Sequence, residues 1–192
     1  FAKTSLDLAR RRIESGGKTA VLKSAFSYAE GGLDGPWAQK PMEKVRGEDP
    51  GVAVMQDGRV LVAGGTTVPD STADALDTGE VYTRSTDKVT PATNKMSTAR
   101  WQNSAVTLLD GRVLVVGGAC LFGLTGCKAG SDATKADLYD PATNAFSPTK
   151  SPLNVGRAYT RAVLLVDGKV LISSSNDDSL ELFDPETETF EK

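Results

Sequence analysis

The sequence predicts an all-β fold of about three repeated four-stranded antiparallel units, preceded by part of another unit. Three observations lead to this prediction: similar segments recur, each holds two strand-length apolar runs around an Asp-Gly pair, and turn sequences follow at matching distances. The similar segments occupy residues 54–65, 108–118 and 164–175. Their Asp-Gly pairs begin at Asp57, Asp110 and Asp167, spaced by 53 and 57 residues. A near-constant period of this size is typical of repeat architectures.

Each copy is predicted to form a β-hairpin. An Asp-Gly pair between apolar runs is a strong signal for a two-residue turn, and glycine supplies the positive φ that the mirror-image turn requires. The second apolar run, as at 113–116, is continuously apolar, which is typical of a strand covered on both faces. We therefore expect an inner strand packed between neighbouring units.

A second pair of strands is predicted after each hairpin, beginning at residues 79–82, 137–140 and 181–184. Asp-Pro turns follow the last two, because proline presets φ and aspartate caps the local backbone. Aromatic residues recur seven positions apart, at Tyr139 and Phe146 and at Phe183 and Phe190, and we expect them in the core. Four short strands per unit, each unit unable to bury its own faces, predict the blades of a β-propeller.

Charged residues also recur once per unit. The acidic set is Glu80, Asp137 and Glu181, and the basic set is Arg46, Arg100 and Arg157. An active-site interpretation would make the carboxylates acids or bases. Because the set recurs in every unit, we interpret it as structural ion pairs that tie strands together.

The repeated segments resemble kelch repeats of the galactose oxidase-like propeller family. The resemblance rests on Asp-Gly-Arg-Val-Leu-Val-x-Gly-Gly and Leu-Tyr-Asp-Pro-Ala-Thr-Asn and spans about residues 46–192. It implies a partial kelch-type β-propeller, with repeats at about 46–99, 100–156 and 157–192. The third copy departs from the pattern, with Ser173-Ser174-Ser175 in place of Gly-Gly and a tight turn expected at 176–178 rather than a calcium site. The family often has a histidine near the repeat-opening arginine, where this chain has Trp101-Gln102 and Ala158-Tyr159.

Residues 1–45 form an N-terminal segment that is harder to interpret. Ser5 is a candidate cap for a short helix through Ile13, and residues 25–45 are expected to hold the outer strand pair of a preceding blade. Closed propellers have roughly 4 to 8 blades. We therefore expect the ring to be completed by further blades of a longer polypeptide or by oligomerisation.

Composition excludes some classes of function. The 192 residues include 22 Lys and Arg against 25 Asp and Glu, for a net charge of -3, which does not favour nucleic acid as a partner. The basic run at 10–12 is expected to be a solvated face. No apolar stretch approaches the roughly 18 residues of a membrane-spanning helix. The chain opens at Phe1 without a leader pattern, so we expect any targeting segment to be removed or to lie outside this sequence.

The connections at 66–78 and 119–135 are the expected recognition loops, because propellers bind through variable loops on a rigid scaffold. Cys120 and Cys127 are predicted to close a small disulfide loop in an extracellular or periplasmic setting, with two free thiols as the alternative. A zinc site is disfavoured, because two thiolates fill half of a tetrahedral shell and the chain has no histidine. The candidate contact residues in this loop are Leu121, Phe122, Leu124 and Lys128.

Three functions are compatible with these features. The leading hypothesis is a non-catalytic scaffold that binds a protein or glycan, with no cofactor. The second is part of a secreted carbohydrate-active or oxidase-type propeller enzyme whose catalytic residues lie outside this chain. The absence of histidine removes imidazole ligands for copper and any Ser-His-Asp arrangement from this chain. The third is a structural subunit of a larger assembly.

Overall fold

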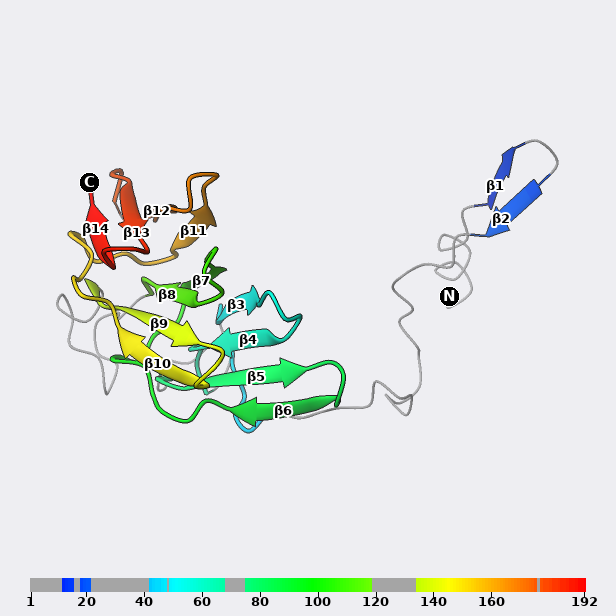
Figure 1. Cartoon of the computed structure of the whole chain (residues 1–192), viewed down its shortest axis with the longest axis horizontal. Coiled ribbons are helices and arrows are strands. Elements are labelled where there is room, and N and C mark those ends of the chain that lie inside the picture. The colour runs from blue at the N-terminus through cyan, green and yellow to red at the C-terminus, as the bar shows by residue number, and fades with distance from the viewer. Residues whose placement is uncertain are drawn as a thin grey trace, which may run out of the picture. The chain divides into compact units, whose positions relative to one another are not determined.

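The computed structural model describes residues 12–15, 18–21, 42–47, 49–67, 75–118, 134–175 and 177–192. The chain divides into two compact units, residues 1–39 and 40–192, and each is described by itself. Across these described residues the regular elements are all β-strands (Figure 1). The predicted all-β class is therefore confirmed.

The described residues of the first unit form one antiparallel strand pair. Strand β1 (Arg12–Ser15) pairs with β2 (Lys18–Val21), and Ile13 lies opposite Ala20. The helix predicted to run through Ile13 is therefore wrong at its end, whereas residues 5–11 lie outside the described residues. The physical reason is that a Gly-Gly pair, which favours tight hairpin connections, separates two short segments that satisfy their backbone groups by pairing.

The second unit contains three four-stranded antiparallel sheets in which consecutive strands pair in chain order. We call them blades 1, 2 and 3. Blade 1 comprises β3 (Gly51–Val54), β4 (Val60–Ala63), β5 (Gly79–Thr83) and β6 (Lys88–Pro91). Blade 2 comprises β7 (Ser104–Thr107), β8 (Val113–Val116), β9 (Ala136–Asp140) and β10 (Ala145–Pro148). Blade 3 comprises β11 (Arg161–Leu164), β12 (Val170–Ser173), β13 (Glu181–Asp184) and β14 (Thr189–Glu191). The predicted number of strands per unit is confirmed.

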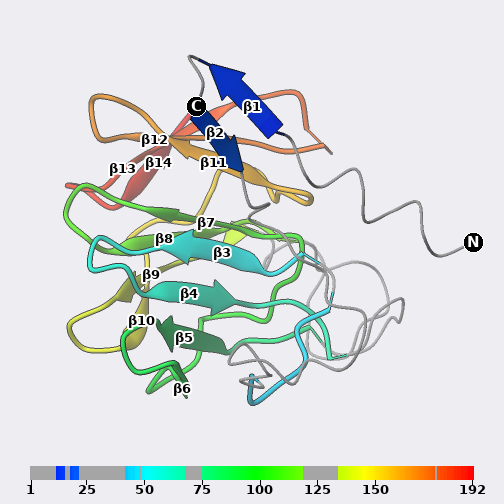
Figure 2. The ribbon, with the colours of Figure 1, turned by 90° about the vertical axis from the view of Figure 1, so that its right-hand side faces the viewer.

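The blades stack face to face, with their first strands nearest to one another. Strand β3 contacts β7, and β7 contacts β11 (Figure 2). One apolar cluster fills the space between blades 1 and 2, and a second fills the space between blades 2 and 3. All four residues of β8 are buried because alternate side chains enter the two clusters. This confirms the strand predicted to be covered on both faces.

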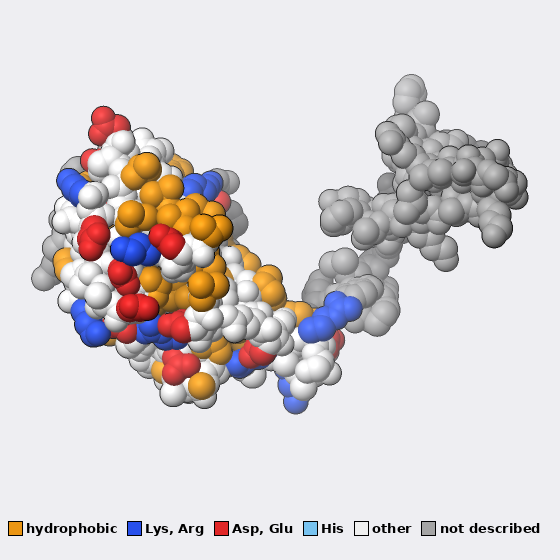
Figure 3. All heavy atoms as spheres, turned by 45° about the horizontal axis from the view of Figure 1, so that its top comes forward, with side chains coloured by type: hydrophobic (Ala, Val, Ile, Leu, Met, Phe, Trp, Pro, Cys, Tyr) orange, Lys and Arg blue, Asp and Glu red, His pale blue; other side chains and the backbone are white. Residues whose placement is uncertain are grey.

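The two outward faces of the stack remain partly uncovered. On blade 1, Val52 and Val54 are 54% and 66% exposed. On blade 3, Val163 and Leu180 are 54% and 52% exposed. Figure 3 brings blade 3 toward the viewer and shows hydrophobic side chains gathered on this side. In the described residues the three sheets are therefore stacked, and the outward faces of blades 1 and 3 carry exposed apolar side chains.

The Asp-Gly turns differ from the predicted two-residue geometry. In blade 1, the Met55 amide donates to the Arg59 carbonyl at 2.8 Å, and the Gly58 amide donates to the Met55 carbonyl at 2.9 Å. Gly58 has a φ of 82°, whereas Asp57 is not left-handed. This is a three-residue connection, a β-turn followed by a left-handed glycine. The same two hydrogen bonds recur in blades 2 and 3.

The mirror-image turn does not form because the aspartate side chain hydrogen-bonds to the arginine two residues later. Asp57 Oδ1 accepts from the Arg59 amide at 2.9 Å, and Oδ2 accepts from Arg59 Nε at 2.8 Å. A side-chain cap of this kind favours an ordinary turn at the aspartate and leaves only the glycine at positive φ.

Alanine substitutions at two left-handed glycines, one open and one in close contact, test how closely blades 2 and 3 approach each other. Gly58 has open space around a would-be Cβ, whereas a Cβ at Gly117 would lie 2.7 Å from the Cβ of Thr160. We expect Gly58→Ala to cost about 1 kcal/mol, from backbone conformation alone. Gly117→Ala should cost about 1–3 kcal/mol more, because it also overpacks the contact. Urea denaturation of both variants measures the difference, and equal losses would contradict the close approach.

Candidate functional site

The blades present two different ends. The turns between the first and second strands, and between the third and fourth strands, lie at one end, which we call the turn end. The connections between the second and third strands, and those from each blade to the next, leave from the opposite end, which we call the loop end (Figure 2). Recognition loops were predicted at the loop end.

A buried ion pair holds the loop end of each blade. Arg46 Nη2 lies 2.8 Å from Glu80 Oε1, Arg100 Nη2 lies 2.6 Å from Asp137 Oδ2, and Arg157 Nη2 lies 3.0 Å from Glu181 Oε1. All six side chains are at most 2% exposed. The predicted structural pairing of the two periodic sets is thus confirmed.

Each arginine also clamps the stem of the connection between the second and third strands. Arg100 Nη1 donates to the Gly117 carbonyl after β8 at 3.0 Å and to the Lys135 carbonyl before β9 at 2.8 Å. Arg46 makes the equivalent bonds to the carbonyls of Gly64 and Thr78. The two ends of each loop are therefore fixed by one buried guanidinium, whose five donors fit this task.

Blade 3 uses a serine hydroxyl where the other blades use a carbonyl after the second strand. Arg157 Nη1 donates to Ser174 Oγ at 3.3 Å and to the Ser179 carbonyl at 2.8 Å. The departure of the third copy from the Gly-Gly pattern therefore preserves the clamp.

The carboxylates tie each blade to the connection that enters it. Asp137 Oδ1 accepts from the Ser97 amide at 2.9 Å, and Glu181 Oε2 accepts from the Asn154 amide at 2.7 Å. In blade 1, Glu80 Oε2 accepts from the Glu43 amide at 2.7 Å. Since the acids pair with arginines and backbone amides, they act as structural groups.

A left-handed residue precedes the first strand of every blade by two positions. These residues are Asp49, Gln102 and Tyr159, with φ values of 42°, 56° and 48°. Such a conformation is uncommon for residues other than glycine and persists only where the surroundings impose it. The first strands are the ones that contact each other between blades, so these positions lie at the loop end beside the line along which the blades meet.

Polar atoms without partners gather at the blade 2 position. Gln102 Oε1, Asn103 Oδ1 and Trp101 Nε1 are buried and have no hydrogen-bond partner within the described residues. Gln102 is 4% exposed, and Tyr159 at the equivalent place in blade 3 is 48% exposed. Unsatisfied buried polar atoms are uncommon in folded proteins. In the sequence these residues stand out only as departures from the family pattern after the arginine, because a left-handed backbone conformation leaves no mark on the residue types.

The predicted contact residues lie outside the described residues. These are Leu121, Phe122, Leu124 and Lys128, together with Cys120 and Cys127. The disulfide and the contact surface therefore stay predictions. The described stems at Gly118 and Thr134 show where this loop leaves and rejoins blade 2.

The turn end carries a repeated clip between neighbouring blades. Arg59 of blade 1 donates to the Pro141 carbonyl of blade 2 at 2.9 Å, and Arg112 of blade 2 donates to the Pro185 carbonyl of blade 3 at 3.0 Å. Arg112 Nη1 also meets Glu188 Oε1 at 2.6 Å. The Arg59 side chain lowers the pKa of Asp57 by hydrogen bonding to its carboxylate. The repeated Asp-Gly-Arg sequence thus joins blades.

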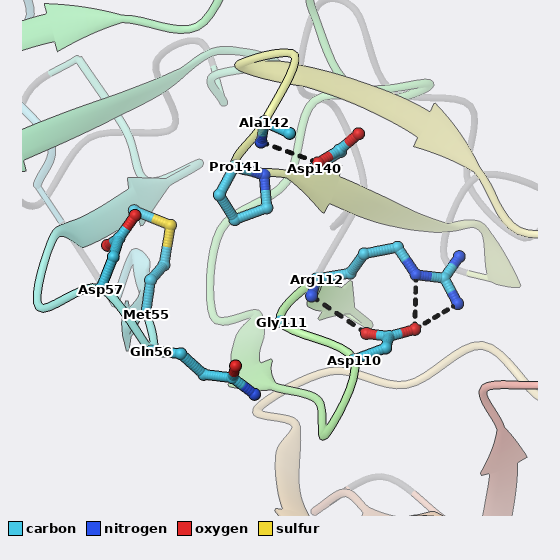
Figure 4. A pocket seen from close by; sticks show the side chains of 9 residues that line it. All are labelled: Met55, Gln56, Asp57, Asp110, Gly111, Arg112, Asp140, Pro141 and Ala142. Carbon is cyan, nitrogen blue, oxygen red and sulfur yellow. Dashed lines mark hydrogen bonds and ion pairs between the residues drawn. The ribbon is translucent and has the colours of Figure 1, made fainter.

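Two open cavities lie along these clips. The cavity between blades 1 and 2 has about 260 Å³ (Figure 4). Asp110 and Arg112, which face it, are hydrogen-bonded to each other, and Asp140 accepts from the Ala142 amide. A second cavity, of about 590 Å³, occupies the equivalent place between blades 2 and 3. Because they recur with the blade contact and their charges are already paired, we assign them to the packing of blades.

Neither a metal-binding cluster nor a membrane-spanning helix occurs in the part of the chain that the structure describes. No cluster of three or more His, Cys, Asp or Glu side chains there is arranged to hold a metal ion. No helix in that part of the chain has the length and apolar character to cross a membrane.

Comparison with known proteins supports the fold. No family model matches the chain, and no curated protein does. Solved structures do match, among them a fungal alcohol oxidase of the AA5 family in complex with copper, described as having catalytic diversity. The identity is 20%, the TM-score is 0.52, and the match covers 77% of this chain and 31% of the oxidase chain. At this identity the likeness concerns the fold alone. It agrees with the all-β fold of four-stranded sheets, and the match spans about a third of the oxidase chain's length.

The buried pairs and a surface pair should differ sharply in their effect on stability. Asp137→Ala leaves the Arg100 charge buried without its carboxylate, so we expect a loss of about 3–5 kcal/mol in the free energy of unfolding. The control is Lys95→Met, which removes an ion pair to Asp77 whose lysine is 67% exposed. That loss should stay below about 1 kcal/mol. Chemical denaturation tests both variants, and a small loss for Asp137→Ala would refute the clamp.

Proposed function

We propose that the chain is a non-catalytic binding scaffold that recognises a protein or glycan at its loop end. The main observation is that one left-handed backbone position, repeated in the three blades, carries three different polar side chains: Asp49, Gln102 and Tyr159. The clamps hold the stems of the neighbouring connections. A rigid frame that presents variable side chains is the arrangement that binding propellers use.

The chemistry of this end favours a ligand with many hydroxyl or amide groups. Tyr159 offers an exposed ring with a polar tip, and at the equivalent position of blade 2 the unpaired Gln102 Oε1 and Trp101 Nε1 are buried. Aromatic rings combined with a few placed polar groups are typical of recognition sites. Among the two ligand classes, these groups favour a glycan. We further propose that the loop residues Leu121, Phe122, Leu124 and Lys128, closed by a Cys120–Cys127 disulfide, extend this surface.

The repeats are proposed to be kelch repeats, with boundaries at about 46, 100 and 157, that form part of a larger propeller. Support comes from the repeated Asp-Gly-Arg clip and from the uncovered faces of blades 1 and 3. As the alternative to a second copy, residues 25–45 are proposed to belong to a preceding blade that covers the outward face of blade 1. An extracellular or periplasmic location is proposed from the two cysteines.

A second candidate is part of an oxidase-type propeller enzyme, favoured by the likeness to a copper-containing alcohol oxidase. The donor set does not fit copper in the described residues, because the chain has no histidine and no suitable cluster was found there. Under this candidate the catalytic residues lie outside this chain.

Binding is tested on a glycan array with the full chain and two variants. Tyr159→Ala should weaken binding of any retained glycan by about tenfold or more, with little change in melting temperature, because the side chain is half exposed. The control, Val166→Ala, changes an exposed residue at the turn end and should bind as the parent does. Equal binding by both variants would move the site away from the loop end.

The loop and the enzyme alternative are tested separately. Phe122→Ala should weaken binding without lowering the melting temperature, and a large loss of stability would show that Phe122 is a core residue. The enzyme alternative is examined by metal analysis after incubation with copper and by peroxide release from a primary alcohol in air. Bound copper or turnover would overturn the binding-scaffold proposal.

A further inference from the structure

We infer that two copies of this chain associate head to tail, with the outward face of blade 3 in one copy packed on the outward face of blade 1 in the other. The inference rests on the propeller architecture and is independent of the proposed ligand. The described residues of two copies together form six four-stranded blades, within the roughly 4 to 8 blades of closed propellers.

The two outward faces carry the same residue positions that meet inside the stack. Between blades 1 and 2, one side supplies Leu61 and Val81, and the other side supplies Val113, Val115 and Tyr139. Between blades 2 and 3, the equivalent residues are Leu114 and Leu138 against Val170, Ile172 and Phe183. Each internal contact therefore joins two faces of different composition. We call the face of a blade that is turned toward the next blade in chain order its leading face, and the face turned toward the preceding blade its following face.

The outward face of blade 3 carries the same positions as the leading faces inside the stack. Blade 3 presents Leu171 and Leu182 at the positions of Leu114 and Leu138, and they are only partly buried. Exposed Val163 lies beside them.

Blade 1 presents the complementary set. Val60, Val62 and Tyr82 stand at the positions of Val113, Val115 and Tyr139, which are fully buried, yet they remain partly exposed. Val52 and Val54 add the exposed edge of β3. A leading face and a following face are thus both present on one chain, and among the residues described within 40–192 neither has its counterpart.

The charges at the turn end agree with this pairing. In the contact between blades 2 and 3, Arg112 meets Glu188 across the blades at 2.6 Å. Lys169 occupies the position of Arg112 in blade 3, and Asp87 occupies the position of Glu188 in blade 1. Head-to-tail packing therefore brings Lys169 of one copy toward Asp87 of the other.

The contact is heterologous, so its two halves can be inactivated separately. Sedimentation velocity of the full chain should give twice the 20.2 kDa chain mass. Val54→Asp damages the blade 1 face, and Val163→Asp damages the blade 3 face. Each variant alone should be monomeric, because every contact then contains a damaged face. An equimolar mixture should form a heterodimer, because one intact face of each kind remains.

One control variant and two charge-reversal variants distinguish a loss of association from misfolding. Val166→Asp, at an exposed turn away from both faces, should leave the mass unchanged. Lys169→Glu and Asp87→Lys should each raise the dissociation constant by about tenfold, because each places like charges together. Mixing these two variants should recover most of the lost affinity, because the opposite charges meet again.

Three results would overturn the inference. A wild-type chain that remains monomeric at about 100 µM would show that two copies do not pair. If such a monomer also loses stability on Val54→Asp, another part of the same chain covers blade 1. A Val163→Asp variant that remains dimeric would show that like faces pair instead.

Discussion

The buried arginine–carboxylate pair in each blade is the interaction on which the rest of the structure depends. One guanidinium binds the carbonyls at both ends of the connection between the second and third strands, and its carboxylate binds the chain that enters the blade. Two charges at most 2% exposed are stable only when their hydrogen-bonding groups are satisfied together. The pair therefore couples strand order, the blade entry and the loop stem in one network, and a change in any of them affects the others.

The apolar clusters depend on a different constraint, which is that no blade covers its own faces. Strand β8 is buried throughout because blades 1 and 3 lie on either side of it, whereas Val60 and Val62, on the corresponding face of β4, stay partly exposed. The sequence of the two strands is nearly the same. Burial in this fold is therefore a property of a blade's position in the stack, and blades 1 and 3 have the composition of inner blades in an outer position.

Much of the fold could be predicted from the sequence, because it depends on local and periodic signals. The period located the blades, the apolar runs located β4, β8 and β12, and the recurrence of Arg100 with Asp137 predicted their pairing. The turn geometry was missed because an Asp-Gly pair is compatible with two turns, and the bond from Asp57 to the Arg59 amide selects between them. The strand pair at residues 12–21 was missed because short segments carry weak periodicity. The left-handed backbone of Gln102 has no sequence signature, since the residue type does not favour it.

The three left-handed residues share a backbone conformation that the architecture requires, whereas their side chains differ as a ligand site would require. Asp49, Gln102 and Tyr159 share a backbone conformation but differ in charge, size and hydrogen-bonding capacity. If the side chains imposed the conformation, residues of one type would be expected there, as glycine is in the turns. The conformation is therefore imposed by the entry into each first strand, and the three blades accommodate different side chains there, buried for Gln102 and half exposed for Tyr159. Specificity for a ligand is most easily built at a position whose backbone conformation is fixed and whose side chain differs between blades.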